Sequence, residues 1–142
     1  MTRSTWTDII SFIEWIVYKL MIGDRTFVDA MYMYCVEGKP PAEISKELNI
    51  SSIKLEHQIR YAMYLIKSRF LCKDVLSKIR DYLDEVPIIA RKTSSGNYEC
   101  LLCGRVLRPA GVVQHIKGKH IKEYRDVVMM LVRIYWERRG SV

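Results

Sequence analysis

The sequence predicts a mainly α-helical protein in which a helical domain, residues 1–90, precedes a small ββα unit at residues 98–139. Three observations support this fold class. Apolar residues recur at helical spacing between residues 9 and 86, and glycines and prolines interrupt the pattern. A compact group of Cys and His residues follows. Helical spacing then resumes, so we expect the helix of the ββα unit to extend to the C-terminus.

The first part of the helical domain is predicted to hold two helices. Thr5 and Asp8 have the spacing of a capping box that would open the first helix, and Gly23 would end it. The second is expected over residues 24–36, with Gly38 closing it. The first helix is apolar almost all the way round, which indicates a helix central to the core or shared with a second subunit. We favour the shared helix, which predicts a homodimer.

A compact pair of helices is predicted over about residues 41–66. Pro41 suits the first position of a short helix, and Asn49 tolerates the left-handed turn that would end it. Ser51 or Ser52 would cap the next helix. That helix is expected to bury one stripe, formed by Leu55, Ile59, Ala62 and Ile66.

Helical spacing continues over residues 67–86, where the helix either runs on unbroken or bends near Ser68. Pro87 ends it, because proline cannot continue a helix. Residues 91–97 form the one clear loop, so we place the domain boundary there. Cys35 and Cys72 stand singly in apolar helical surroundings and are expected to be buried thiols.

Four potential metal ligands follow the loop: Cys100, Cys103, His115 and His120. Two cysteines separated by two residues fit a tight turn of a β-hairpin, and two histidines separated by four can meet one metal near a helix end. Thiolate and imidazole are ligands that Zn²⁺ prefers, and four protein ligands leave no open position on a tetrahedral ion. We expect one structural Zn²⁺ per chain, which supplies folding energy to a unit too small to fold alone.

This stretch resembles the Cys2His2 zinc-finger family. Besides the ligands it has the family's small core, at Tyr98, Leu107 and Val112. It departs in one respect, because eleven residues separate Cys103 from His115 where about twelve are usual. The resemblance implies that Arg108 and Gln114 contact bases of a nucleic acid. It also implies phosphate contacts from three lysines, Lys117, Lys119 and Lys122.

The helix pair at residues 41–66 looks like a helix-turn-helix. Glu43-Ile44-Ser45 and Leu48-Asn49-Ile50-Ser51 resemble the fourth region of bacterial sigma factors and the LuxR-type regulators. In that family the second helix lies in the major groove, which implies DNA contacts from the exposed side chains of this helix. The alternative is a helical hairpin whose polar face contacts only solvent. The implied contacts are Ser52, Lys54, His57, Arg60 and Tyr61.

The net charge of +7 lies entirely in the C-terminal part of the chain. Residues 1–86 carry 12 Lys and Arg against 12 Asp and Glu, and residues 87–142 carry 11 against 4. A basic unit beside a neutral one indicates a polyanionic partner, and nucleic acid is the commonest. We predict a DNA-binding transcription regulator that acts on double-stranded DNA. The combination of motifs resembles small regulators of archaea and their viruses.

An alternative function stays open, namely a protein-interaction or RNA-binding module. Residues 115–120 resemble part of the U1-type and double-stranded-RNA-binding fingers, which makes RNA a possible partner. We do not expect an enzyme, because the metal site has no vacancy and no acidic cluster accompanies it. Glu14 and Lys19 interrupt the apolar run of residues 9–22, so we expect no membrane span and a cytoplasmic, nucleoid-associated protein.

Overall fold

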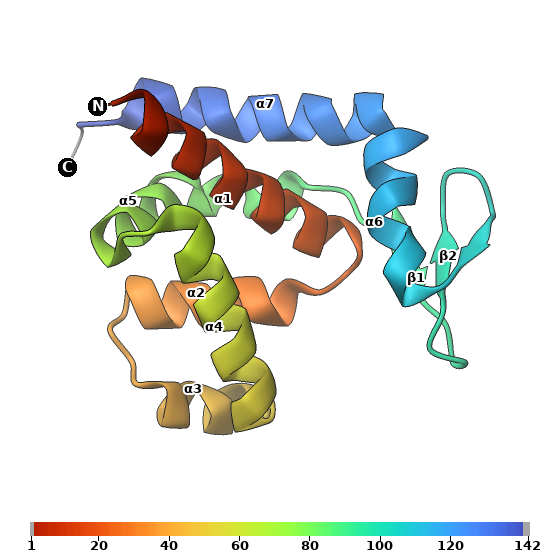
Figure 1. The fold of residues 1–142 in the computed structure, drawn as a ribbon, viewed down its shortest axis with the longest axis horizontal. Coiled ribbons are helices and arrows are strands. Elements are labelled where there is room, and N and C mark those ends of the chain that lie inside the picture. The colour runs from red at the N-terminus through yellow and green to blue at the C-terminus, as the bar shows by residue number, and fades with distance from the viewer. Residues whose placement is uncertain (1, 141–142) are drawn as a thin grey trace.

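The computed structural model describes residues 2–140 and shows a mainly α-helical fold with one small antiparallel sheet, which confirms the predicted fold class (Figure 1). Met1, the first residue of the predicted helical domain, lies outside the described residues. The elements are α1 (Arg3–Met21), α2 (Arg25–Cys35), α3 (Pro41–Leu48), α4 (Ser52–Ile66), α5 (Arg69–Ile79), the 3₁₀ helix η1 (Arg80–Glu85), β1 (Ala90–Lys92), β2 (Tyr98–Cys100), β3 (Val106–Leu107), α6 (Pro109–Gly118) and α7 (Ile121–Arg138).

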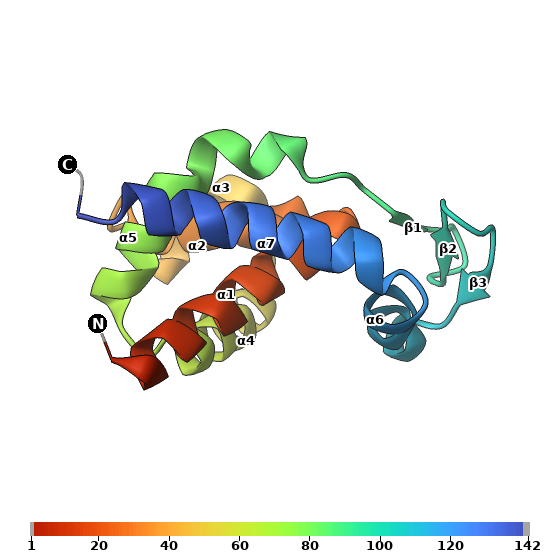
Figure 2. The ribbon, with the colours of Figure 1, turned by 90° about the horizontal axis from the view of Figure 1, so that it is seen from above.

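Helix α1 is the centre of the core. It lies between α7 on one side and α4 on the other, and α2 also packs on it (Figures 1 and 2). Its apolar residues therefore find partners within the same chain. The buried ones are Ile9, Phe12, Ile13, Trp15, Ile16, Val17, Leu20 and Met21. Within residues 2–140, no helix has both the length and the apolar character that crossing a bilayer requires.

Helix α7 covers the flank of α1 that led us to predict a second subunit. It also packs on α5, and Tyr124, Leu131 and Tyr135 are among its buried residues. Much of the apolar surface that we assigned to a subunit interface is thus buried inside one chain, while Ile121, Met129 and Trp136 of α7 stay exposed. The homodimer remains a prediction.

Helix α1 begins earlier than the sequence predicts. Thr2 is its N-cap, and the Thr2 hydroxyl accepts a hydrogen bond from the backbone N–H of Thr5 at 3.2 Å. The prediction that Thr5 and Asp8 form a capping box is therefore wrong. The extended backbone at Thr2 places its hydroxyl on the unsatisfied N–H groups of the first turn. Asp8 instead accepts a hydrogen bond from Lys67 Nζ at 2.9 Å, across to the end of α4.

The turn between α3 and α4 has the predicted local structure. Asn49 adopts the left-handed conformation, with φ of 53°, and ends α3. The Ser45 hydroxyl donates to the carbonyl oxygen of Ile50 at 2.5 Å, which ties the turn to the helix before it. Ser51 is the N-cap of α4 and accepts from the backbone N–H of Lys54 at 3.1 Å. The predicted stripe of α4 is buried as expected.

Replacing Ser51 by alanine should lower the free energy of unfolding by about 1 kcal/mol, because the N–H of Lys54 would lose its capping acceptor. Chemical denaturation followed by circular dichroism would measure the change. Ser52→Ala is the matched control, since Ser52 is exposed within the first turn and should alter stability by only a few tenths of a kcal/mol. Equal losses for both variants would contradict the assignment of the cap.

The helix does not run on unbroken after α4. It breaks near Ser68, which is one of the two alternatives that the sequence left open. Lys67 adopts the left-handed conformation, with φ of 66°, and ends α4. Ser68 then caps α5, accepting from the backbone N–H of Leu71 at 3.2 Å. The last part of the predicted helix is the 3₁₀ helix η1 rather than α-helix. The break lets α5 pack against both α2 and α7.

Cys35 and Cys72 form a disulfide between α2 and α5, so the expectation of free thiols was wrong. Both side chains are buried, as predicted. Packing of α2 on α5 brings the two Cα atoms to 6.0 Å, which is within the usual range for a disulfide. This proximity could not be predicted from the sequence, because the two cysteines are 37 positions apart in the chain.

The helix of the finger does not run unbroken to the C-terminus, contrary to our prediction. It ends at Gly118, and α7 begins at Ile121 in a different direction (Figure 1). His120, at the junction, has φ of −111° and ψ of 37°, outside the helical range. The bend allows α7 to lie along α1 and α5 instead of pointing away from the core.

Hydrogen bonds at both ends of α7 hold it on the core. The hydroxyl of Tyr124 donates to Glu14 at 3.3 Å, and that of Tyr135 donates to Asp74 at 2.6 Å. Burial raises the pKa of both tyrosines, and the neighbouring carboxylate, Glu14 for Tyr124 and Asp74 for Tyr135, raises it further. Burial also raises the pKa of Tyr18 to about 12.

Stability should therefore fall at alkaline pH. In the unfolded chain these phenols ionise near pH 10, whereas in the folded protein they stay protonated to higher pH. The contribution of these tyrosines to the free energy of unfolding should be constant below about pH 9.5 and decrease as pH rises from about 10 towards 12. Thermal melts would show this, and Tyr124→Phe should flatten the decrease. Tyr64→Phe, at an exposed tyrosine, should leave the decrease unchanged.

The predicted boundary loop is partly strand. Residues 90–92 form β1, which pairs with β2 so that Ala90 lies opposite Cys100, and β3 pairs on the other side of β2. The Ile89 N–H donates to the carbonyl oxygen of Met21 at 2.8 Å, and the Leu101 N–H donates to that of Ile89 at 2.9 Å. The end of α1 is thus hydrogen-bonded to the segment that leads into the sheet. We call residues 90–120 the finger.

Candidate metal centre and nucleic-acid face

The four predicted ligands come from two parts of the finger, the β2–β3 hairpin and the C-terminal half of α6 with the residues that follow it. Cys100 ends β2, Cys103 lies in the turn before β3, His115 is on α6 and His120 follows α6. The turn is tight because Gly104 adopts φ of 78°, and its N–H donates to the carbonyl oxygen of Cys100 at 2.8 Å. This geometry turns both thiols towards the helix.

The ligand atoms converge on one point. The Nε2 atoms of His115 and His120 lie 3.2 Å apart, Cys100 Sγ is 3.3 Å from His120 Nε2, and Cys103 Sγ is 3.4 Å from His115 Nε2. All four ligand atoms lie within 4.8 Å of one another. A tetrahedral ion with metal–sulfur bonds of about 2.3 Å and metal–nitrogen bonds of about 2.05 Å would separate the nitrogens by about 3.3 Å and sulfur from nitrogen by about 3.5 Å. The four side chains can therefore hold a metal ion.

The surroundings favour the protonation states that bind metal. Cys100, His115 and His120 are buried, and Cys103 is exposed. A backbone hydrogen bond at Arg105, aided by the Cys100 thiol and nearby cations, lowers the pKa of Cys103 towards the thiolate. Burial, together with the neighbouring His120, lowers the pKa of His115 towards the neutral imidazole. Thiolate and neutral imidazole are the ligand forms that a metal requires.

The predicted small core of the finger is present. Val112 is buried in the hydrophobic core, and Tyr98 and Leu107, which lie opposite each other in the sheet, are partly buried against that core. The shorter interval between Cys103 and His115 is accommodated at the start of α6, where Arg108 is the N-cap and Pro109 the first helical residue. Proline suits this position because the N–H it lacks would be unpaired there anyway.

Comparison of the chain with protein-family models, with curated proteins and with solved structures finds no match. The function of the chain must therefore be argued from its own residues.

The residues of α4 predicted to contact DNA are all exposed: Ser52, Lys54, His57, Arg60 and Tyr61. His57, Arg60 and Tyr61 lie on the side of α4 away from its buried stripe, as the helical spacing predicts, and Ser52 and Lys54 lie in its first turn. The residues of the finger and of the first turn of α7 that we predict to contact nucleic acid are exposed as well: Arg108, Gln114, Lys117, Lys119 and Lys122. Arg108 lies at the start of α6, Lys119 just after its end, and Lys122 in the first turn of α7.

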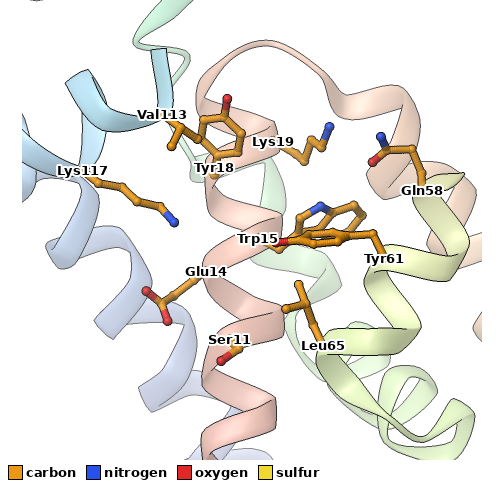
Figure 3. Close-up of a pocket in the computed structure, with 10 residues that line it drawn as sticks. All are labelled: Ser11, Glu14, Trp15, Tyr18, Lys19, Gln58, Tyr61, Leu65, Val113 and Lys117. Atoms are coloured by element: carbon orange, nitrogen blue, oxygen red, sulfur yellow. The ribbon is translucent and has the colours of Figure 1, made fainter. Parts of the chain in front are cut away.

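Two clefts bring members of these two groups together. The first lies between α1, α4 and α6, has a volume of about 460 Å³, and is bordered by Tyr61 of α4 and Lys117 of α6 (Figure 3). The second, of about 380 Å³, is bordered by Lys54 of α4 and by Lys92 and Tyr98 of the finger. The α4 helix and the finger therefore face each other across both clefts.

Sequence analysis missed several residues of these clefts. Lys92 was assigned to a loop, although it contributes to the positive charge of the C-terminal part. Lys19 and Gln58 were not proposed as site residues, yet both line the first cleft. Lys19 is one of the two charged residues in the apolar run of residues 9–22, which is a signal that it faces a polar space. Gln58 gave no such signal, because a glutamine is ordinary on a helix surface.

Proposed function

We propose that the finger binds one Zn²⁺ per chain and that the ion is structural. The distances between its ligand atoms support this, as does a donor set of two thiolates and two imidazoles. The ion would cross-link the hairpin, α6 and the start of α7, and so supply folding energy to the finger. Four protein ligands leave a tetrahedral ion no open position, so the proposal includes no catalytic role.

We propose further that the protein is a DNA-binding transcription regulator. The α3–α4 pair would act as a helix-turn-helix, with α4 in the major groove. The observation that carries this proposal is the position of Lys54 and Tyr61 of α4 on the same two clefts as Lys92 and Lys117 of the finger. A duplex seated against α4 would then have finger lysines within reach of its backbone.

The charge distribution supports different roles in DNA binding for residues 1–86 and residues 87–142. The segment 1–86 has no net charge, so α4 would contribute local contacts to base edges, for which Arg60 is suited. Residues 87–142 carry the whole net charge and would supply attraction to phosphates that does not depend on sequence.

Binding of a labelled DNA duplex at two salt concentrations tests the proposal. If Lys54, Lys117 and Lys119 each meet one phosphate, affinity should fall about 40-fold between about 50 and 200 mM salt. Selection of preferred sequences from a random duplex pool would then show whether binding is specific. Absence of any shift at the lower salt concentration would contradict DNA binding.

One observation favours a second candidate function, a protein-interaction module. The turn of the finger exposes three aliphatic side chains, Leu101, Leu102 and Val106. Exposed apolar groups gathered at one place are typical of protein contacts. If this function holds, the duplex should not bind, and polar substitutions at Leu101 and Leu102 should abolish capture of the partner while leaving the metal in place.

A further inference from the structure

The first cleft has walls of different chemical character. Its floor is α1, where Trp15 is almost fully buried and Tyr18 lies beside it. One wall is α4, with Gln58 and Tyr61, and the opposite wall is α6, with Lys117 (Figure 3). The volume of about 460 Å³ is within the range of small-molecule sites in proteins.

The α4 wall offers an aromatic ring and an amide that lacks a partner. The Tyr61 side chain is 52% exposed, so a planar ligand can stack on it. The Oε1 atom of Gln58 is buried and has no hydrogen-bond donor among the described residues. A buried acceptor without a donor is unfavourable, because it has given up its hydrogen bonds to water. Gln58 as a whole is only partly buried, so a turn of its side chain would bring this oxygen to a donor on a ligand in the cleft.

The α6 wall offers a positive charge. Lys117 extends towards the cleft and forms no ion pair with any residue from 2 to 140, although its ammonium lies 5.5 Å from the centre of the Tyr124 ring (Figure 3). The other two charged groups of the cleft are already engaged. Lys19 pairs with Asp24 at 3.4 Å, and Glu14 accepts from the Tyr124 hydroxyl at 3.3 Å. Lys117 is therefore the group placed to receive an anion.

We propose that this cleft binds a single nucleotide, with its base on the Tyr61 and Gln58 wall and its phosphate at Lys117. The Tyr61 ring suits stacking with a base, and the Gln58 oxygen suits an N–H donor of that base. The Lys117 ammonium on the opposite wall suits the phosphate. The nucleotide can come from two sources, a free nucleotide or an unpaired nucleotide of a bound strand. Tyr61 and Lys117 also belong to the residues that we propose contact a duplex, but a single nucleotide needs only the two walls of this cleft, so its binding can be tested without a duplex.

Titration of the zinc-loaded protein with nucleoside 5′-monophosphates, followed by calorimetry, tests the proposal. We expect a monophosphate to bind at least about tenfold more tightly than its nucleoside or inorganic phosphate, since each of these reaches only one wall. Lys117→Ala should reduce the affinity for the monophosphate to that for the nucleoside. Tyr61→Ala should weaken nucleoside and monophosphate alike. Lys73→Ala, which removes an exposed lysine of α5 outside the cleft, should change neither.

A labelled single-stranded oligonucleotide distinguishes the two sources. If the cleft accepts an unpaired nucleotide of a strand, monophosphates should compete with the oligonucleotide, and Lys117→Ala and Tyr61→Ala should both weaken it. If the ligand is a free nucleotide, the monophosphate should bind without displacing the oligonucleotide. Failure of all four monophosphates to bind at about 10 mM, with oligonucleotide affinity unaffected by Tyr61→Ala, would overturn the proposal. Duplex binding measured in parallel would show whether the proposed DNA-binding function fails with it.

Discussion

Replacing Cys103 by serine is expected to reduce metal affinity by about 70- to 900-fold and to unfold the finger while the helical core persists. The magnitude follows if one of four ligands carries about a quarter of an apparent binding free energy of 10–16 kcal/mol. Cys103 is exposed, so serine creates no cavity, and the change acts through the metal. Metal analysis should find far less than one equivalent after dialysis. Amide exchange should become fast in β2 and stay slow in α1, whose core residues lie outside the finger.

Leu102→Ser is the matched control for this experiment. Leu102 lies in the same turn and is exposed, but it offers no ligand atom, so this variant should keep its metal and its slow exchange. Full retention of metal by Cys103→Ser would contradict the four-ligand site. Unfolding of the entire chain would instead show that the hydrogen bonds from residues 89 and 101 couple the finger to the core more strongly than we expect.

The second large effect is expected on DNA binding. Replacing both Lys117 and Lys119 by alanine should weaken binding to all duplexes alike and flatten the dependence of log affinity on log salt by about two units, if each lysine meets one phosphate. Arg60→Ala should act differently, because a side chain that contacts a base edge carries specificity. We expect it to reduce the preference for a selected target over random DNA by 1–3 kcal/mol, or about 5- to 150-fold.

Lys73→Ala provides the control, because Lys73 is an exposed lysine on α5 that borders neither cleft. It should change neither affinity nor specificity. The opposite pattern, with specificity lost on changing Arg108 and Gln114 and unaffected by Arg60, would show that the finger contacts the bases. In that case α3 and α4 would only hold the finger in position and would not contact the bases.

The comparison of sequence with structure separates local features from distant ones. The left-handed turn at Asn49, the cap at Ser51 and the stripe of α4 were predictable, because each depends on residues within one or two turns of one another. The convergence of four metal ligands was predictable for a related reason. Their spacing allows a single hairpin and helix to bring them together, and few other arrangements of two Cys and two His do so.

Tertiary structure decided everything that depends on pairs of residues far apart in the chain. The Cys35–Cys72 disulfide and the covering of α1 by α7 both arise from helix packing, for which periodicity specifies a buried face but not its partner. The bend at His120 reverses a prediction that local helical spacing supported, since the chain gains more by laying α7 on the core. The sequence by itself thus determined the helices, the turn and the metal ligands of this protein. Only the folded arrangement placed α4 and the finger on common clefts, because α1 packs against α4 and its last residue is hydrogen-bonded to the segment that leads into the finger.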